Sequence, residues 1–203
     1  MLIELPANFS FPEHFYVACS GGVDSMALLS FVSRSRKKFT VIHFNHGTPE
    51  ANRYQGFVQR YCQKHSIPLL LSRCAAYSDT RMSAELYWAE QRHNYFSSLN
   101  APVMLAHHLN DASETWLMSC LNGKPHVMSW ATRNCIRPLL LTPKDNLIAW
   151  CTTHQVPWVE DLSNQENGCQ RNLIRNELMP KALKVNPGLL TVVKKMLLES
   201  RKS

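Results

Sequence analysis

The sequence lacks any apolar run close to the roughly 18 residues that a membrane-spanning helix requires. Its N-terminus, with Glu4, Pro6 and Asn8 among the first residues, also lacks the basic start and the apolar core of a secretory signal. These two absences argue against membrane-spanning and secreted proteins. They predict a soluble, cytoplasmic protein with no membrane partner.

Paired cysteines are also missing. The seven cysteines are an odd number, and no two of them are spaced as Cys-x-x-Cys. A complete disulfide framework uses an even number of cysteines, whereas zinc knuckles and cysteine-held iron–sulfur clusters use closely spaced pairs. The sequence therefore predicts reduced thiols with a structural role.

Acidic residues are scarce relative to basic ones. The 15 Asp and Glu residues stand against 22 Lys and Arg, which gives a formal net charge of +7. This balance favours a polyanionic partner, because contacts with phosphates release counterions. A solvated basic surface is the alternative. The 203 residues, 45% of them hydrophobic, predict a single domain over residues 1–203.

The chain has no internal repeat and no low-complexity segment, and it alternates β-rich runs with helical patterns. Apolar strands that alternate with helices are typical of a parallel sheet. We therefore predict a three-layer α/β fold, with helices on both faces of a mostly parallel sheet and ligands at the carboxyl ends of its strands. The predicted strands are residues 15–19, 39–44, 68–71 and 102–106, the predicted helices are 26–32, 54–65, 84–99, 111–121, 147–154 and 189–200, and 122–137 is interpreted as a loop or lid.

A short loop after the first predicted strand carries the strongest chemical signal. It reads Ser20-Gly21-Gly22-Val23-Asp24-Ser25. Two glycines let the backbone approach an anion and adopt positive φ, and the following helix adds its positive N-terminal end. The loop is neither a Walker loop nor a dinucleotide fingerprint. The carboxylate of Asp24 suits Mg²⁺ between phosphate oxygens, or it anchors the loop to its own backbone.

This loop resembles the PP-loop of the N-type ATP-pyrophosphatases, which adenylate a carbonyl oxygen and release pyrophosphate. Further segments resemble those of the bacterial tRNA(Ile)-lysidine synthetase family, in the family's order. They are His43-Phe44-Asn45-His46-Gly47, Glu85 with Arg92, His107-His108-Leu109-Asn110-Asp111-Ala112-Ser113-Glu114-Thr115, Arg137-Pro138-Leu139-Leu140, Pro157-Trp158-Val159-Glu160-Asp161 with Asn164, and Arg171-Asn172 with Arg175, Leu178 and Pro180.

The resemblance covers the family's catalytic domain and implies an adenine nucleotide alpha hydrolase-like, Rossmann-like fold. It implies an ATP- and Mg²⁺-dependent ligase that joins free lysine to a cytidine of a tRNA anticodon loop. ATP is then expected at residues 20–25, with Mg²⁺ at Asp24. Catalytic roles are implied for Asn45, Arg92, His108, Asp111 and Glu114, and substrate or phosphate contacts for Glu85, Arg171, Asn172 and Arg175.

Spacing adds a physical reason for two of these groups. His108, Asp111 and Glu114 share one helix face at the carboxyl end of a strand, where carboxylates suit Mg²⁺ or the ammonium of lysine. An N-cap with a satisfied histidine is the alternative. Arg171 and Arg175, four residues apart on a presumed helix, suit phosphates of ATP or RNA, with surface solvation as the alternative.

The sequence departs from the family pattern at several points. Ala89 stands where the family has an arginine, His93 stands where it has tyrosine, and the loops at 48–49 and 122–126 are changed. The chain ends at Ser203, so we expect no C-terminal tRNA-binding domains, and RNA affinity is expected from a basic helical tail over about 181–203. A homodimer would widen that RNA surface.

Two other functions stay open at this stage. A PP-loop tRNA sulfur-transferase shares the adenylation step, but it needs cysteine pairs or a persulfide donor. A divergent nucleotide- or RNA-binding protein with reduced activity would keep the fold without efficient turnover.

Overall fold

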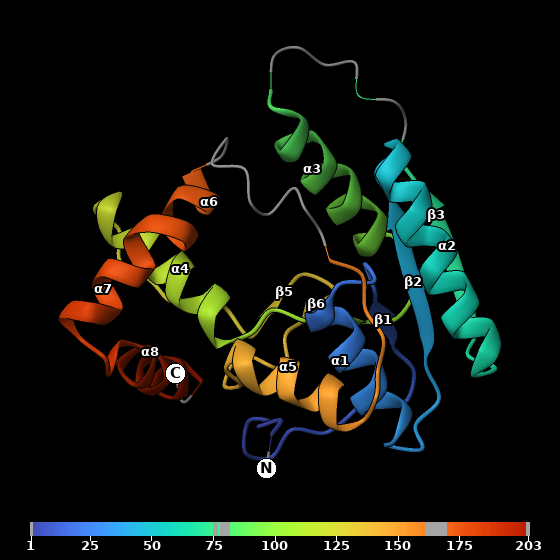
Figure 1. Cartoon of the computed structure of the whole chain (residues 1–203), viewed down its shortest axis with the longest axis horizontal. Helices are drawn as coiled ribbons and strands as arrows, with labels where there is room; N and C mark the ends of the chain where they lie inside the picture. Colours follow the sequence, from blue (N-terminus) through green and yellow to red (C-terminus); the bar gives the residue numbers. More distant parts are fainter. Residues whose placement is uncertain (1, 75–76, 78–81, 161–169, 202–203) are drawn as a thin grey trace.

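The computed structural model describes residues 2–74, 77, 82–160 and 170–201, except the side chain of Glu85. Within this part of the chain, six strands form one sheet in the order β3-β2-β1-β4-β6-β5. All neighbouring strands are parallel except β5 and β6, which confirms the mostly parallel sheet (Figure 1). The strands are β1 (Tyr16–Ala18), β2 (Thr40–Asn45), β3 (Leu69–Arg73), β4 (Val103–Met104), β5 (Ala131–Thr132) and β6 (Cys135–Ile136).

Helices cover both faces of this sheet, as predicted. Val17 of β1 packs in one apolar cluster with Leu28 of α1 and Leu147 of α5. Ile42 of β2 points to the other face and packs with Phe96 of α3, because successive side chains of a strand alternate between faces. The helices are α1 (Val23–Ser33), α2 (Pro49–Lys64), α3 (Ala84–Ser97), α4 (Leu109–Leu121), α5 (Lys144–Thr153), α6 (Gln170–Leu173), the π-helix η2 (Ile174–Leu178), α7 (Met179–Val185) and α8 (Leu189–Ser200).

Helix α2 begins earlier than the predicted residue 54. Thr48 is its N-cap, and the Thr48 hydroxyl accepts the backbone N–H of Ala51. Pro49 occupies the first turn, where its missing N–H costs nothing. The prediction began at Tyr54 because it followed only the apolar face of the helix, whereas the first turn is polar and is defined by its cap.

The segment 122–137 is not entirely the loop that was predicted, because β5 and β6 form a short hairpin within it. Arg133 lies in the hairpin turn with a left-handed φ of 52°. The side chain of Asn134 joins the hairpin to the end of α3. Its Nδ2 donates to the backbone carbonyls of Phe96, Leu99 and Ala101 at 3.0, 3.0 and 2.9 Å. Strands of two residues have no detectable period, so only the tertiary contacts reveal this hairpin.

Helix α8 packs on α4 and encloses a second apolar cluster. Val193 and Leu197 of α8 are fully buried and pack with Leu109 of α4. The indole of Trp130 donates a hydrogen bond to the carbonyl of Leu197 at 3.0 Å. The described part of the predicted basic tail, residues 181–201, is therefore helical for most of its length and is packed into the fold.

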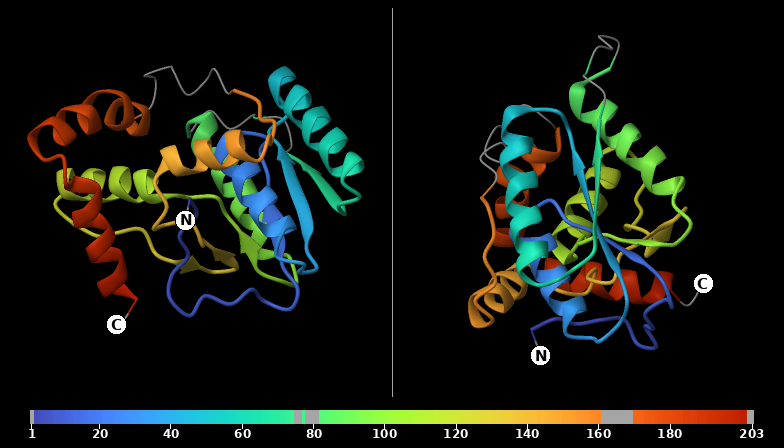
Figure 2. Two further views of the ribbon diagram at one scale, coloured as in Figure 1. Left: turned by 60° about the horizontal axis from the view of Figure 1, so that its bottom comes forward. Right: turned by 90° about the vertical axis from the view of Figure 1, so that its right-hand side faces the viewer.

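Two basic residues, one in α8 and one directly after it, contact the N-terminal segment, which lies beside this helix (Figure 2). Lys194 Nζ lies 2.6 Å from Glu4 Oε2, and Arg201 donates to the carbonyl of Ala7 at 2.6 Å. These two cations serve intramolecular contacts. Lys181, Lys184 and Lys195 are exposed.

The described cysteines are all free thiols, which confirms the prediction for them; Cys169 lies outside the described residues. Burial raises the pKa of Cys19 and Cys151 to about 11 and that of Cys62 to about 12. These thiols therefore stay protonated at neutral pH. Among the described residues, no helix has both the length and the apolar character needed to cross a membrane.

Replacing Leu197 by alanine tests whether α8 belongs to the folding unit. Leu197→Ala should lower the free energy of unfolding by about 2–5 kcal/mol, because it opens a cavity in a closed apolar cluster. Urea unfolding followed by circular dichroism measures the change. Leu198→Ala is the control, since Leu198 is 38% exposed. Equal stabilities of the two variants would contradict a packed role for α8.

Candidate active site

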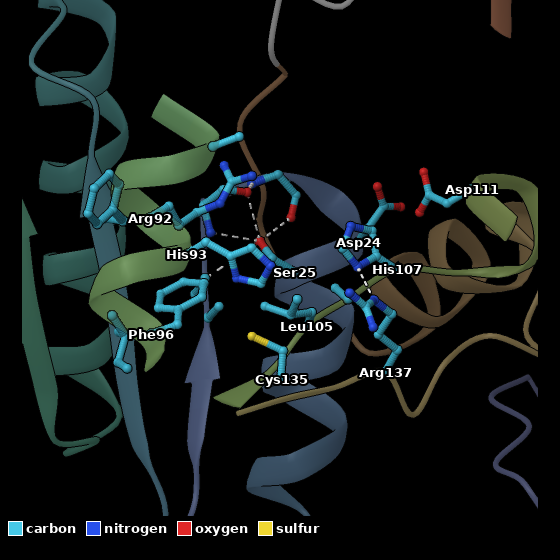
Figure 3. A pocket seen from close by; sticks show the side chains of 18 of the residues that line it. Asp24, Ser25, Arg92, His93, Phe96, Leu105, His107, Asp111, Cys135 and Arg137 are labelled. Carbon is cyan, nitrogen blue, oxygen red and sulfur yellow. Dashed lines mark hydrogen bonds between the residues drawn. The ribbon is translucent and has the colours of Figure 1, made fainter. Parts of the chain in front are cut away.

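A cavity of about 520 Å³ lies at the carboxyl ends of the parallel strands, beside the start of α1. Its lining comes from β1, β2, β6, the segment after β4, the helices α2, α3 and α4, and the Ser20–Ser25 loop, so it lies where ligands bind in open α/β sheets (Figure 3). The residues that line it are Ala18, Cys19, Ser20, Gly22, Asp24, Ser25, Ile42, Phe44, His46, Tyr54, Ala89, Arg92, His93, Phe96, Leu105, Ala106, His107, Asp111, Cys135, Arg137 and Val159.

One glycine of the Ser20–Ser25 loop is needed for its conformation. Gly21 has φ of +96°, and a Cβ there would lie 3.3 Å from Phe57 and 3.4 Å from Val58. The backbone angle therefore favours glycine, and a Cβ would in addition be tight against Phe57. Gly22 has φ of −72° and an ordinary distance of 3.6 Å from its hypothetical Cβ to Ser20 Oγ. Positive φ is thus needed at one of the two glycines.

Serine hydroxyls use the backbone donors of the loop itself. Ser25 Oγ accepts the N–H groups of Ser20 and Gly21, both at 3.2 Å, and donates to the carbonyl of Gly22 at 2.9 Å. Ser20 Oγ accepts the N–H of Gly22 at 3.3 Å. The hydroxyls therefore hold the loop in shape.

The donors available to a bound anion come from the first turn of α1. The first four N–H groups of a helix have no partner within the helix, unless the N-cap supplies one. Here Met26 N bonds to Gly22 O at 3.0 Å, which leaves the N–H groups of Val23, Asp24 and Ser25 at the positive end of the helix dipole. A helix start of this kind is a general phosphate site.

Asp24 stands at the same helix start and carries an oxygen without a partner. Its Oδ1 is buried and has no hydrogen-bond partner among the described residues. Its Oδ2 lies 3.6 Å from Nε2 of His108 and 4.0 Å from Nζ of Lys144. A buried, unpartnered carboxylate oxygen beside a phosphate site suits a divalent cation.

No group of three or more metal-ligating side chains occurs in the described part of the chain. A Mg²⁺ ion at Asp24 would therefore take its remaining ligands from phosphate oxygens and water, as Mg²⁺ commonly does. The residues present fit the ion on those terms.

His108 and Asp111 form a reciprocal cap at the start of α4. Nδ1 of His108 accepts the backbone N–H of Asp111 at 3.3 Å, and Asp111 Oδ2 accepts the backbone N–H of His108 at 3.0 Å. Because Nδ1 accepts, the neutral ring carries its proton on Nε2. That atom lies 3.4 Å from Asp111 Oδ2 and 3.6 Å from Asp24 Oδ2. His108 therefore caps the helix and also separates the two carboxylates.

Arg171 and Arg175 approach the same helix face from α6 and η2. Nε and Nη2 of Arg175 donate to Oε1 and Oε2 of Glu114 at 2.7 and 2.9 Å. Nη2 of each arginine also lies near Asp111 Oδ1, at 3.2 Å for Arg171 and 3.1 Å for Arg175. The two arginines and the two carboxylates, predicted as separate phosphate and cation sites, thus form one partly buried network.

This network shifts the pKa values of its members. Burial raises the pKa of Asp111, but His108, His107, Arg171 and the backbone N–H of His108 outweigh that effect and hold the pKa below its usual range. The hydrogen bond with Glu114 raises the pKa of Arg175. Asp111 is therefore a carboxylate at neutral pH.

The residues assigned from the sequence do not all reach the cavity. Those that line it are Ser20, Gly22, Asp24, Ser25, Arg92 and Asp111. Those that are not part of the lining are Gly21, Val23, Asn45, His108, Glu114, Arg171, Asn172 and Arg175. Glu85 lies on α3, but its side chain is outside the described residues.

Asn45 is oriented toward α2, and this position does not match a catalytic contact. Its side chain is fully buried. Its Nδ2 donates to Asn52 at 3.0 Å and to Gln55 at 2.8 Å, and its Oδ1 accepts the backbone N–H of Gly47 at 2.7 Å. Asn45 is thus a positioning residue that connects the end of β2 to α2.

Sequence reasoning assigned no role to several side chains that line the cavity. They include Phe44, His46, Tyr54, His93, His107 and Arg137. Phe44, His107 and Arg137 stand near strand ends and within segments that resemble the family pattern, and these were the available signals. Tyr54 and His93 come from helices, and only the packing of those helices brings them to the cavity.

His107 and Arg137 form a pair of neighbouring lining residues. Arg137 Nε donates to Nδ1 of His107 at 3.2 Å (Figure 3). Burial is the main cause that lowers the pKa of His107 to about 4; Asp111 raises it, and Arg137, Arg171 and Arg92 lower it further. His107 is therefore neutral at physiological pH and accepts from the guanidinium.

Comparison with known proteins places this site in a family context. Residues 4–182 match the PP-loop domain family. Curated tRNA(Ile)-lysidine synthases from Lactiplantibacillus plantarum and Haemophilus ducreyi are 32% and 30% identical over 192 and 193 residues, which are 86% and 89% of this chain but 43% and 44% of theirs. The chain thus spans less than half the length of these relatives.

Comparison with solved structures shows which fold this chain shares. An NH3-dependent NAD synthetase from Campylobacter jejuni matches with a TM-score of 0.52 over 94% of this chain and 86% of its own, at 14% identity. An NMN synthetase from Francisella tularensis matches with a TM-score of 0.54 over 90% and 84%, also at 14% identity. At this identity the likeness concerns the architecture alone.

The lowered pKa of His107 predicts a pH dependence of stability. Its folded pKa of about 4 lies below the ordinary histidine value of 6.5, so the unfolded chain binds more protons between these values. Stability should therefore be lost as the pH falls from about 6.5 to about 4, by at most about 3 kcal/mol from this group.

The His107→Asn variant keeps an acceptor for Arg137 but cannot be protonated in this range. Urea unfolding at several pH values between 7 and 4.5 should show a shallower loss of stability than in the unchanged protein. His14→Asn, at an exposed histidine, should leave the pH dependence as it is. An unchanged slope in His107→Asn would refute the assignment.

Proposed function

The chain belongs to the PP-loop domain family, and from this premise we propose that it uses ATP to activate a cytidine of a tRNA anticodon loop and then joins lysine to that base. One observation carries the proposal. A single cavity unites an anion-binding helix start, two carboxylates and two arginines. These are the groups needed for a nucleotide, an amine and the charge that develops between them.

The phosphates of ATP would bind at the start of α1. The N–H groups of its first turn supply donors, and the Ser25 hydroxyl keeps the loop in the shape that exposes them. Asp24, with its unpartnered Oδ1, would hold Mg²⁺ beside these phosphates. When bound, the ion would neutralise part of the phosphate charge. A cavity of about 520 Å³ is within the usual range for ligands of this size.

In the first step, the C2 carbonyl oxygen of cytidine attacks the α-phosphorus of ATP. A phosphorus–oxygen bond forms, the bond from the α-phosphorus to the bridging oxygen breaks, and pyrophosphate leaves with the electron pair. Arg92 lines the cavity on α3, and its cation is assigned to the negative charge on the α-phosphate. Aromatic side chains at Phe44 and Tyr54 also line the cavity and offer surfaces for a planar base.

In the second step, the ε-amine of lysine attacks C2 of the adenylated base. The new carbon–nitrogen bond replaces the carbon–oxygen bond to AMP, AMP leaves with the electron pair, and the nitrogen loses a proton to water. Asp111, the second carboxylate that lines the cavity, is assigned to hold the amine. Glu114, behind the lining, fixes Arg175 and thereby the orientation of Asp111. Binding three reactants together can supply about 7–11 kcal/mol of the barrier.

The sulfur-transferase alternative finds little support in the cavity. Cys135 is the cysteine on β6 that lines it, and burial raises the pKa of this thiol. A protonated thiol is a poor nucleophile and a poor persulfide carrier. The other cysteine in the lining, Cys19, has a pKa raised to about 11.

A lysine-transfer assay tests the proposal directly. The protein is incubated with ATP, Mg²⁺, radiolabelled lysine and an anticodon stem-loop with the anticodon CAU, and lysine in acid-precipitable RNA is counted. Label should enter the RNA with one pyrophosphate released for each lysine. Pyrophosphate release on another RNA without lysine transfer would indicate a different PP-loop substrate. Loss of both, with RNA and ATP still bound, would indicate a binding protein.

Asp111→Asn tests the assigned amine site. Lysine transfer should fall by about a hundredfold, because the charge that holds the amine is gone while an acceptor for the arginines remains. The Michaelis constant for lysine should rise, and ATP affinity should stay within about twofold. Asp145→Asn is the matched control, since Asp145 is an exposed acidic residue in the first turn of α5. Equal loss of lysine and ATP binding would contradict a specific role in amine binding.

Ser25→Ala tests the loop. ATP affinity, measured by calorimetry, should fall about tenfold, because two backbone N–H groups lose their acceptor and the loop loses its shape. Ser33→Ala, at the other end of α1, removes a hydroxyl that donates to the carbonyl of Leu29. This control should bind ATP normally. Unchanged ATP affinity in Ser25→Ala would remove the phosphate role of the loop.

A further inference from the structure

A basic wall of three arginines stands at the cavity, away from the network that neutralises Arg171 and Arg175. Arg92 of α3 and Arg137, directly after β6, line the cavity (Figure 3). Arg133 lies in the β5–β6 turn and is exposed. We call these three residues the arginine wall.

Neutral groups hold Arg137 in place. Its Nε donates to His107 Nδ1 at 3.2 Å, and its Nη1 donates to the carbonyl of Ser129 at 2.9 Å and to Thr132 Oγ1 at 3.1 Å. None of these acceptors carries a negative charge. The guanidinium is thus oriented but not neutralised, and it reaches Thr132, the neighbour of Arg133.

The turn that carries Arg133 is also fixed. Arg133 has a left-handed φ of 52°, and Asn134 ties the turn to three carbonyls at the end of α3. A flexible, merely solvated arginine needs neither feature. Burial is the main cause that lowers the pKa of His93, and the charges of Arg133, Arg137 and Arg92 lower it further. This agrees with a cluster of positive charge around the His93 ring.

Carboxylates are missing around this wall in the described chain. No Asp or Glu described by the structure lies within 4.0 Å of Arg92, Arg133 or Arg137, although Arg171 and Arg175 each contact two. Like charges brought together without counterions favour an anionic ligand.

We propose that the arginine wall, through Arg133 and Arg137, binds the phosphate backbone of the single-stranded RNA on either side of the base that enters the cavity, while Arg92 keeps its assigned contact with ATP. This inference rests on the proposed function, and it names the surface where the RNA substrate of that function would bind. Arginine suits phosphate because its planar fork donates two parallel hydrogen bonds. Phosphate contacts position an RNA without reading its sequence. The phosphates stay at the rim while one base is splayed into the cavity, as is usual for recognition of unpaired loops.

Arg133→Gln tests the wall at an exposed position that the catalytic assignments do not use. Binding of the CAU anticodon stem-loop, without ATP or lysine, is measured by fluorescence anisotropy across a salt series. The Kd should rise roughly fivefold at low salt, and the salt dependence of log Kd should become shallower by about one unit.

Arg36→Gln is the matched control. Arg36 is also exposed and also has a left-handed φ, of 58°, but it follows α1 and is no part of the cavity lining. RNA affinity should be retained in this variant. Equal losses of RNA affinity in the two variants would show that the effect comes from net charge alone, and would overturn the inference.

A second measurement separates RNA phosphates from those of ATP. Calorimetry should give the same ATP affinity for Arg133→Gln and the unchanged protein. A loss of ATP affinity with normal RNA affinity would assign the wall to the nucleotide and overturn the inference. Because neither assay requires chemistry, failure of lysine transfer with an intact Arg133 effect would refute the proposed reaction and leave the RNA surface in place.

Discussion

The contact of Arg175 with Glu114 and Asp111 is the interaction on which the site depends. Glu114 is almost fully buried, and a buried carboxylate is stable only with a hydrogen-bonded cation. Arg175 satisfies both of its oxygens and also contacts Asp111. Through this contact, the C-terminal helices are joined to the face of α4 that borders the cavity. The chain's last third is therefore part of the site's construction.

The site has two regions of different charge. Near α1 and α4, anionic oxygens of Asp24 and Asp111 stand around Nε2 of His108, next to donors that attract phosphate. Near α3 and β6, Arg92 and Arg137 line the cavity beside histidines whose pKa is lowered, so that they stay neutral. A reaction between a nucleotide, an amine and an RNA base needs both regions, because its partners carry opposite charges.

Several features were open to prediction because they depend on neighbouring residues. The Ser20–Ser25 loop follows β1 and starts α1, and its chemistry is contained in six consecutive residues. The alternation of apolar strands with helices likewise follows from local period. His108 and Asp111 could be placed at a helix start for the same reason, and the N-cap alternative describes part of their geometry. The β5–β6 hairpin was missed because two-residue strands have no period.

Asn45 and the arginines show what local pattern cannot decide. Asn45 ends a strand, but the direction of its side chain is set by α2, which supplies its partners Asn52 and Gln55. Arg171 and Arg175 pair with acids about 60 residues away, and Arg137 pairs with His107 from another strand. The sequence by itself determined the phosphate loop, the parallel α/β fold and the residue types of the site, because these follow from short-range spacing. Only the tertiary structure decided which charges are neutralised and which remain available, because that depends on contacts between distant segments.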